Sequence, residues 1–466
     1  MAPRKSRLIL VSNRLPITLA FEGQDFTLQP SSGGLASGLR APHESSHGIW
    51  IGWPGETPRL ALKQRAELDT SLSKLGLSPV YLIRHELKGF YEDFSNGAMW
   101  PVFHGLIEQL PLVIEGWQTY KSVNQKFAQA VAESYRKGDV IWIHDYQLAL
   151  VPKLLRELIP DARIGFFLHI PFPATEVFSV LPARVQLLEG MLGADLIGFH
   201  AQAYVDNFLA AARLILGVET SQGYITYEGR NVSVNAFPLG IDARMWQKQA
   251  RSAQVSRRVK ELVNDLGDRT MLLGIDRLDY TKGLPRRIAA VEQLLERDPS
   301  LAERIHFVQV IVPSRKNVES YGRLLRQLTE LVGRINSTFG SASSVPIHLI
   351  HRSLPEDEVV ALYSAANVML VTPLRDGMNL VAKEFIATRL GGDGVLVLSE
   401  FAGAAEELTE AVIVNPYDVE GLANRIEEAI AMPKDEQRQR MALLRKKVFS
   451  HDVHVWANSF LEALRP

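Results

Sequence analysis

The sequence contains no cysteine, which excludes disulfide bonds and thiolate metal sites. It has no run that approaches the roughly 18 uninterrupted apolar residues of a membrane-spanning helix. It also lacks an excess of either charge, because 51 lysines and arginines stand against 52 aspartates and glutamates. A general nucleic-acid binder would carry a basic surplus. These absences predict a soluble, cytoplasmic protein that binds neither membranes nor nucleic acids.

Metal-binding patterns are missing as well. There is no D-x-D motif, and the 12 histidines lack the spacing of metal ligands. We therefore expect no metal site and no cofactor. A negatively charged ligand of this protein would have to be neutralised by arginine and lysine side chains.

What the sequence does contain is enough material for two domains, with 466 residues of which 46% are hydrophobic. Short apolar runs alternate with helical patterns along the chain, which is typical of βαβ units in parallel sheets covered by helices on both faces. The expected strands are 7–13, 48–53, 79–84, 139–145, 163–169 and 195–200, and then 270–276, 305–312, 346–351, 367–373, 394–399 and 411–416. The two series are separated near residues 235–242. They predict an α/β protein with two doubly wound domains and a cleft between them, and a C-terminal helix that docks elsewhere on the surface.

The expected strands end in polar residues. In open α/β sheets, ligands bind outside the carboxyl ends of the strands, so these residues are candidates for a site. They are Asn13, Arg14, His144, Asp145, His169, His200, Asp276, Arg277, 313–315, Arg375 and Asp376.

The segment "GIDRLDYTKGLPRR" places two cations where a strand ends and a helix begins. Pro285 suits the first turn of a helix, so Lys282 lies at or just before the helix start. Arg277 and Lys282 would then stand beside free backbone amides and the positive end of the helix dipole, where a phosphate or diphosphate binds well. The alternative is that both cations simply pair with Asp276 and Asp279.

The segment "LRDGMNLVAKEFIA" has the same strand–loop–helix form, with a helix expected from about Leu380. Its loop amides could receive phosphate or sugar oxygens, and Asp376 could accept a hydrogen bond from a sugar hydroxyl. Glu384 lies one turn into the helix, within reach of a ribose diol. The alternative is that Asp376 or Asn379 is only a helix cap.

Three further candidates each have a structural alternative. The adjacent Gly33 and Gly34 in "SSGGLASGL" allow a close backbone approach to a ligand, or form an ordinary turn. His169 in "FFLHIPFP" stands at the start of a proline-stiffened loop and is either catalytic or structural. Asp145 in "IWIHDYQ" is either a hydroxyl acceptor or a helix cap.

Taken together, the motifs resemble the trehalose-6-phosphate synthases of glycosyltransferase family 20. The resemblance runs from about residue 8 to residue 432. It rests on "LILVSNRLP", "SSGGLASGL", "GWPGE", "FYEDFSNGAMWPVFH", "WQTYKSVN", "WIHDYQL", "RIGFFLHIPFP", "RLDYTKGLPRR", "VPSR", "TPLRDGMNLVAKE" and "SEFAGAAEEL". It implies a GT-B fold, with a Rossmann-like acceptor-binding domain at 1–237, a Rossmann-like nucleotide-sugar-binding domain at 238–450 and a helix at 451–466 that docks on the first domain.

The resemblance also implies a reaction, the transfer of glucose from UDP-glucose to glucose 6-phosphate with retention of configuration and without a metal. It assigns catalysis to His169, Arg277, Lys282 and Asp376. It assigns the donor to Gly33, Gly34, Arg277, Lys282, Asp376, Gly377, Met378, Asn379, Leu380, Val381, Ala382, Lys383 and Glu384. It assigns the acceptor to Arg14, Tyr91, Trp100, Asp145 and Arg315. Family habit implies a homodimer or homotetramer, and the chain carries no aspartate-rich phosphatase motif, so we expect the phosphorylated disaccharide as the product.

Two other readings share much of this pattern. A glucosylglycerol-phosphate synthase would have the same fold and donor site but another acceptor. An inactive sugar-phosphate sensor would have lost charged site residues, whereas the charged residues named above are present. The sequence leaves open whether the nucleotide is UDP, GDP or ADP.

Overall fold

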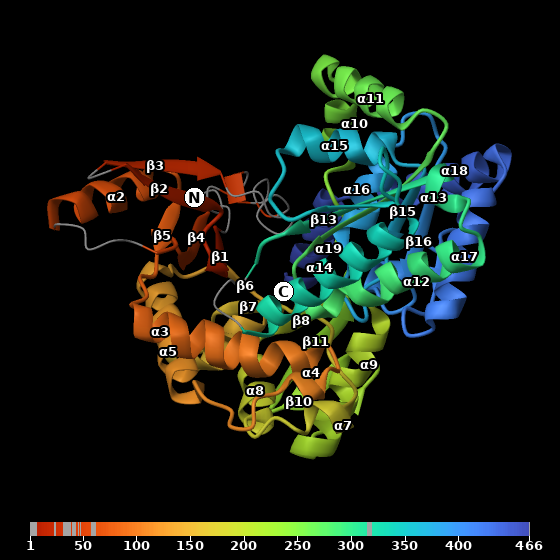
Figure 1. Cartoon of the computed structure of the whole chain (residues 1–466). Coiled ribbons are helices and arrows are strands. Elements are labelled where there is room, and N and C mark those ends of the chain that lie inside the picture. Colours follow the sequence, from red (N-terminus) through yellow and green to blue (C-terminus); the bar gives the residue numbers. More distant parts are fainter. Residues whose placement is uncertain are drawn as a thin grey trace. The chain divides into compact units, whose positions relative to one another are not determined.

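A computed structural model describes residues 7–22, 25–30, 39, 43–44, 46, 48–56, 62–314 and 319–465. Its chain divides into two compact units (Figure 1). Unit 1 comprises Met1–Pro238 together with Val453–Pro466, and unit 2 comprises Leu239–Asp452. None of the helices in the described ranges is long and apolar enough to cross a membrane.

Unit 1 is built on a sheet in the order β5-β4-β1-β6-β7-β8-β11-β10-β9. Its parallel strands are β1 (Leu8–Arg14), β4 (Ile49–Trp53), β5 (Leu77–Pro79), β6 (Val140–His144), β7 (Arg163–Phe167), β8 (Leu196–Phe199) and β11 (Arg230–Ala236). The antiparallel strands β10 (Tyr224–Tyr227) and β9 (Thr220–Ser221) extend one edge. From β1 the chain adds β4 and β5 on one side and β6, β7 and β8 on the other, so the strand order reverses between β1 and β6.

The C-terminal helix α19 (Val453–Leu464) packs on strands β7 and β8 of unit 1. Each strand carries a glycine where the helix lies against it. A Cβ on Gly165 would stand 2.7 Å from the ring of Phe460, and one on Gly198 would stand 2.8 Å from it. The Phe460 ring stacks on Trp142 with a centroid distance of 4.5 Å. The glycines in "RIGFF" and "LIGF" therefore make room for this helix.

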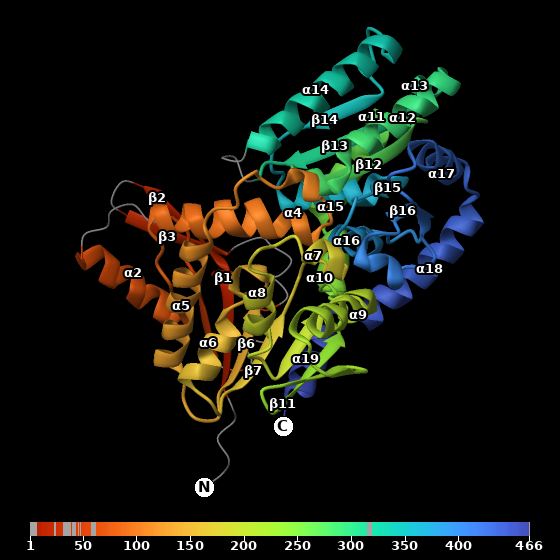
Figure 2. The same cartoon turned by 90° about the horizontal axis from the view of Figure 1, so that it is seen from below.

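Unit 2 has a wholly parallel sheet in the order β14-β13-β12-β15-β16-β17. Its strands are β12 (Thr270–Arg277), β13 (Ile305–Val312), β14 (Ile347–Ile350), β15 (Val368–Val371), β16 (Val395–Ser399) and β17 (Val412–Val414). Here the order reverses between β12 and β15. Figure 2 shows the same strands from below, with helices along the sheet.

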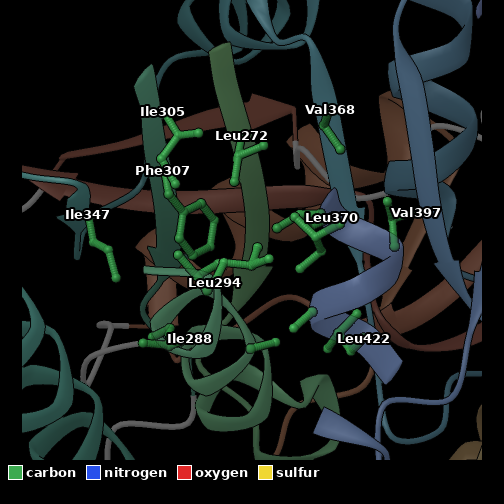
Figure 3. Packing of buried hydrophobic residues seen from close by; sticks show 14 of the residues in the cluster. Leu272, Ile288, Leu294, Ile305, Phe307, Ile347, Val368, Leu370, Val397 and Leu422 are labelled. Carbon is green, nitrogen blue, oxygen red and sulfur yellow. The ribbon is translucent and has the colours of Figure 1, made fainter. Parts of the chain in front are cut away.

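One face of the sheet in unit 2 is covered by α12 (Leu284–Arg297), α14 (Glu319–Phe339) and α17 (Val419–Ala431). Figure 3 shows Leu294 of α12 beside the ring of Phe307 on the sheet, and Ile288 of the same helix belongs to this cluster of buried residues. Helices α15 (Glu356–Ala365) and α16 (Leu380–Thr388) contact β12, β15 and β16. Because side chains alternate along a strand, Leu273 faces away from the cluster that holds Leu272. The predicted α/β class with two doubly wound sheets is confirmed.

Several local expectations need correction. Residues 79–84 were expected to form a strand, but β5 ends at Pro79 and helix α3 (Arg84–Leu87) starts soon after. Pairing with β4 ends there, because Tyr81 turns to hydrogen-bond Asp69 and Ile83 is exposed. The segment after β1 contains an antiparallel hairpin of β2 (Ile17–Glu22) and β3 (Asp25–Pro30), which was not among the expected strands. The strands 220–236 were also missed.

Other helices of the described chain were not singled out from the sequence. They are α2 (Leu62–Lys74), α5 (Trp117–Ser134), α8 (Arg184–Met191), α10 (Ala243–Ala250), α11 (Ala253–Leu266) and α18 (Lys434–Ser450). Two further helices of unit 1 are α6 (Val151–Leu158) and α9 (Gln202–Ala211). A π-helical turn, η4 (Ala212–Leu216), continues α9.

Candidate active site

The candidate donor residues of unit 2 gather where its strand order reverses. Arg277 ends β12, and the loop with Asp376 follows β15, the neighbouring strand. Ligands in doubly wound sheets bind at this switch point, because the loops of the two strands diverge there and leave space. Sheet order alone therefore places these two segments side by side.

Two helices begin at this switch point. Helix α12 starts after Gly283, and α16 starts after Asn379; neither helix has a side-chain hydrogen bond that caps its N-terminus. The first backbone N–H groups of a helix have no partner within it, and the helix dipole makes that end positive. Two such ends form a strong anion site. Asn379 stands at the N-cap position of α16, but its side chain makes no capping hydrogen bond.

Gly283 is required at the start of α12. Its φ is +67°, a conformation that residues with a side chain rarely adopt. A Cβ at this position would also stand 2.5 Å from the carbonyl oxygen of Thr372. The glycine thus allows the loop after β12 to lie against the end of β15.

Lys282 is held at this site by a carboxylate of the second loop. Its Nζ lies 2.5 Å from Oδ2 of Asp376, and both side chains are largely buried. The same Oδ2 accepts a hydrogen bond of 3.0 Å from Nδ2 of Asn379. Asn379 has a φ of +76°, and its buried Oδ1 has no hydrogen-bond partner in the described part of the chain. A strained asparagine with an unsatisfied oxygen is typical of a ligand-binding loop.

The sequence left open that Arg277 and Lys282 pair with Asp276 and Asp279. Lys282 instead pairs with Asp376 of the second loop. Asp276 pairs with Arg287, whose Nη1 lies 2.5 Å from its Oδ2, and Arg287 is completely buried. Asp279 accepts hydrogen bonds from the amide and hydroxyl of Thr281. Arg287 was missed, because the sequence does not reveal that a cation eleven positions along reaches back under the strand.

Two residues of the predicted donor segment on α16, Ala382 and Lys383, have side chains that point into the protein interior. Ala382 and Lys383 are buried, and Nζ of Lys383 contacts the carbonyl of Leu239 at 2.8 Å and the carboxylate of Glu407. Any contact of these two residues with a donor therefore falls to their backbone. Burial lowers the pKa of Lys383, and the charge of Glu407 opposes this effect.

Glu384 is the titratable group of this helix that stands out. Its Oε2 accepts a hydrogen bond of 3.0 Å from the hydroxyl of Tyr363, which the sequence did not suggest. Burial raises the pKa of Glu384 to about 7, and the Tyr363 hydrogen bond works against that rise. A carboxyl with a pKa near neutrality at a switch point is a candidate functional group.

Another missed residue is Gly403, in the turn after β16. A Cβ on it would stand 2.1 Å from the carbonyl oxygen of Gly377. Its amide donates to the carbonyl of Asp376, and the amide of Ala404 donates to that of Met378. The turn thus fixes the backbone of the donor loop, and only glycine fits.

The candidate acceptor residues of unit 1 also gather at a switch point. Arg14 ends β1, and Asp145 directly follows β6, the strand beside it. The guanidinium of Arg14 lies 4.8 Å from the ring centroid of Trp53 at the end of β4. Asp145 has a φ of +78°, and its Oδ1 accepts a hydrogen bond of 3.1 Å from the amide of His169. Asp145 therefore joins the loops after β6 and β7 rather than capping a helix.

Tyr91 and Trp100 lie on a segment that covers this end of the sheet. Residues Lys88–Met99 form a π-helix, η1, and Trp100 begins the short helix α4 (Trp100–Phe103). Nδ2 of Asn96 donates to the carbonyl of Tyr91, five positions earlier, and Oδ1 of Asn96 accepts from the hydroxyl of Tyr146. Such π-helical turns are frequent at functional sites. Asn96 thus ties the segment to the turn after Asp145.

His169 lies in a cluster of imidazoles. Its Nε2 lies 3.1 Å from Nδ1 of His144, and its ring centroid lies 5.2 Å from that of His200. Burial lowers the pKa of His169 well below the ordinary value, and the charge of His200 lowers it further. His169 is therefore neutral at pH 7 and able to serve as a hydrogen-bond donor or acceptor.

Three predicted residues, Gly33, Gly34 and Arg315, lie outside the described residues. The other candidates form two groups, one at the switch point of each unit. Within the described ranges, no group of three or more histidine, aspartate and glutamate side chains is placed to hold a metal ion.

Comparison with known families now decides the class of protein. The model of glycosyltransferase family 20 matches residues 6–466, which is nearly the whole chain. The chain belongs to glycosyltransferase family 20. The family predicted from the sequence motifs is thereby confirmed.

Curated relatives in family 20 align over almost their full length. The chain is 43% identical over 467 residues to the trehalose-6-phosphate synthase of Mycolicibacterium vanbaalenii, covering 98% of this chain and 95% of that protein. It is 42% identical over 475 residues to the trehalose-6-phosphate synthase of Mycobacterium leprae, covering 98% of this chain and 94% of the relative.

Solved structures agree with the fold. The UDP-forming α,α-trehalose-phosphate synthase of Burkholderia xenovorans has a TM-score of 0.88 at 34% identity and covers 99% of both chains. An α,α-trehalose-phosphate synthase (UDP-forming) of Burkholderia xenovorans in complex with glucose-6-phosphate has a TM-score of 0.86 at 33% identity and covers 99% of this chain and all of that one. An E. coli structure bound with UDP-2-fluoro glucose has a TM-score of 0.89 at 34% identity and covers 98% of this chain and 99% of that one.

Proposed function

We propose that this family 20 chain transfers glucose from UDP-glucose to glucose 6-phosphate and releases α,α-trehalose 6-phosphate and UDP. The observation that carries the proposal is the pair of uncapped helix N-termini at the switch point of unit 2, with Lys282 and Arg277 beside them. The relatives' activity, and the nucleotide-sugar and sugar-phosphate ligands of the solved neighbours, support it.

In this proposal the donor diphosphate lies at the N-termini of α12 and α16. Backbone N–H groups, the helix dipoles and the side chains of Arg277 and Lys282 neutralise its charge. Asp376 exchanges its contact with Lys282 for hydrogen bonds to glucose hydroxyls. Glu384, in ionised form, accepts from the ribose diol. Gly33 and Gly34 close over the donor through their backbone.

The acceptor binds at the switch point of unit 1. Arg14 and Arg315 hold its phosphate, because the planar guanidinium matches two phosphate oxygens. Tyr91 and Trp100 line the sugar. Asp145 positions the hydroxyls of the acceptor sugar. His169, whose amide donates a hydrogen bond to Asp145, stands beside the transferred glucose.

The reaction proceeds on the front face of the donor. The bond between C1 of glucose and the β-phosphate oxygen breaks, and a bond forms from C1 to the anomeric oxygen of glucose 6-phosphate on the same side. The proton of that hydroxyl passes to a diphosphate oxygen, so configuration is retained without a protein nucleophile. A retaining glycosidase would instead need two carboxyls about 5 Å apart. Arg277 and Lys282 stabilise the charge that develops on UDP.

The first experiment measures UDP release from UDP-glucose in EDTA, with glucose 6-phosphate, glycerol 3-phosphate or no acceptor. The anomeric protons of the product are read by NMR. Release only with glucose 6-phosphate and an α,α linkage support the proposal, including its independence of metal. Preference for glycerol 3-phosphate would overturn the acceptor assignment. If no nucleotide is released with any acceptor, and other nucleotide sugars in place of UDP-glucose also give none, the sensor is favoured.

Replacement of Arg277 tests the role of the cations. Arg277→Ala is expected to lower kcat by at least about 10²–10³-fold, the cost of losing one donor to a developing anion, with an unchanged circular dichroism spectrum. The matched control is Arg286→Ala, since Arg286 is also on this segment but contacts Tyr417. Near-normal turnover of Arg277→Ala would refute the assignment.

A further inference from the structure

The sheet of unit 1 ends in three imidazoles on adjacent strands. His144 ends β6, His169 follows β7, and His200 follows β8. The ring of His144 is completely buried, and it lies against Trp142 with a centroid distance of 4.6 Å. The half-buried His169 lies between the other two imidazoles, with centroid distances of 5.3 Å to His144 and 5.2 Å to His200. None of the roles proposed above uses His144.

His144 and His169 are both neutral at physiological pH. Burial lowers the pKa of His144 well below its ordinary value, and a charge on His169 would lower it further. The pKa of His169 is lowered in the same direction. A neutral imidazole carries one N–H, so each ring has one nitrogen that donates and one that accepts. The hydrogen bond between them therefore links the tautomers of the two rings.

The contact of 3.1 Å between Nδ1 of His144 and Nε2 of His169 has two possible directions. If His144 donates, His169 carries its own proton on Nδ1. If His169 donates, His144 must carry its proton on Nε2. That Nε2 is buried and has no hydrogen-bond partner in the described part of the chain. An N–H group buried without an acceptor is rarer in proteins than an acceptor without a donor, so the first direction is favoured.

We propose that His144 is a positioning residue that fixes His169 in the Nδ1–H tautomer, so that His169 offers an N–H donor to a sugar oxygen. The backbone of His169 is held independently, by its amide hydrogen bond to Asp145. Together the two contacts set both the place and the hydrogen-bonding character of the ring. The use of this donor on substrate rests on the proposed function, whereas the tautomer itself does not.

The test observes the tautomer directly in the full chain. Histidine is labelled with ¹⁵N, and long-range ¹H–¹⁵N correlations distinguish Nδ1–H from Nε2–H; the signals of His169 are assigned by their loss in His169→Ala. Three replacements of His144 are compared. Asn places an amide near the position of Nδ1, Gln places one near Nε2, and Phe keeps the ring shape without a donor.

The expected result is an Nδ1–H tautomer of His169 in the unchanged protein and in His144→Asn, and a shift toward Nε2–H in His144→Gln and His144→Phe. Turnover should follow the same division. His144→Gln and His144→Phe should lose kcat by on the order of ten-fold or more, with little change in KM, while His144→Asn is rescued. The near-isosteric Asn and Gln variants keep the comparison valid if His144→Phe fails to fold.

An Nε2–H tautomer of His169 in the unchanged protein would overturn the proposal. So would an Nδ1–H tautomer that persists in both His144→Gln and His144→Phe. If the chain does not release UDP with any acceptor, the proposed function fails while the NMR result still decides the role of His144. If UDP is released and the tautomer is Nε2–H, only the positioning role fails.

Discussion

Loss of the buried guanidinium of Arg287 should destabilise unit 2 more than the loss of any surface cation. Its Nη1 pairs with Oδ2 of Asp276 at 2.5 Å and with Oε1 of Gln309 at 3.0 Å, and its Nε donates to Oγ1 of Thr372 at 2.9 Å. A Cβ on Gly274 would stand 2.7 Å from Nη1, so the strand carries glycine where the guanidinium lies. Arg287→Met keeps much of the side-chain volume and removes the charge.

The magnitude follows from what the replacement leaves behind. The side chain of Asp276 is only 4% exposed, so its carboxylate would remain buried without a cation. Breaking a buried pair in this way costs about 3–5 kcal/mol. For a domain of 150–250 residues, each kcal/mol lowers the melting temperature by about 2–4 °C, which gives a drop of roughly 6–20 °C.

Thermal and guanidinium unfolding, followed by circular dichroism, measure this effect. The double variant Asp276→Asn, Arg287→Met should be less destabilised than Arg287→Met, since no buried charge is then left unpaired. Arg425→Met is the control: Arg425 pairs with Glu428, and the two side chains are 53% and 46% exposed, so its loss should cost less than about 1 kcal/mol. A loss below about 1 kcal/mol for Arg287→Met would refute the reasoning.

Two other predictions concern titration and packing. Because burial raises the pKa of Glu384 from 4.5 to about 7, the native state binds more protons than the unfolded state in that range. The free energy of unfolding should therefore fall as the pH rises from about 4.5 to about 7, by at most about 3 kcal/mol. UDP-glucose should also bind more weakly at pH 6 than at pH 8, because only the ionised carboxylate accepts from both ribose hydroxyls. Calorimetry of Glu384→Gln should show neither dependence, and persistence of both would assign them to another group. Gly165→Ala should destabilise by about 1–3 kcal/mol, because its Cβ meets the Phe460 ring of α19 at 2.7 Å, and hydrogen exchange in α19 should rise. Gly333→Ala, with nothing within 4 Å of its Cβ in helix α14, should instead stabilise by about 0.5–1 kcal/mol; equal effects of the two changes would contradict the packing argument.

The sequence by itself determined the elements whose signals are local. The strand expected at 305–312 is β13, Ile305–Val312, and the helix expected from about Leu380 is α16. Continuous apolar runs and a glycine–asparagine loop before an amphipathic stretch encode such elements within about ten residues. The ordered motif blocks likewise predicted the family, because their order along the chain is a property of the sequence. The hairpin after β1 was not among the expected strands.

Only the tertiary structure decided which side chains meet. Asp276 has two near neighbours of opposite charge in sequence, yet it pairs with Arg287, because the first turn of α12 passes beneath the end of β12. Lys383 lies in a predicted donor segment but turns inward to Leu239 and Glu407. His144 and His169 meet because β6 and β7 are neighbours in the sheet. Strand order and helix direction set these pairings, and neither is written in the periodicity of any single segment.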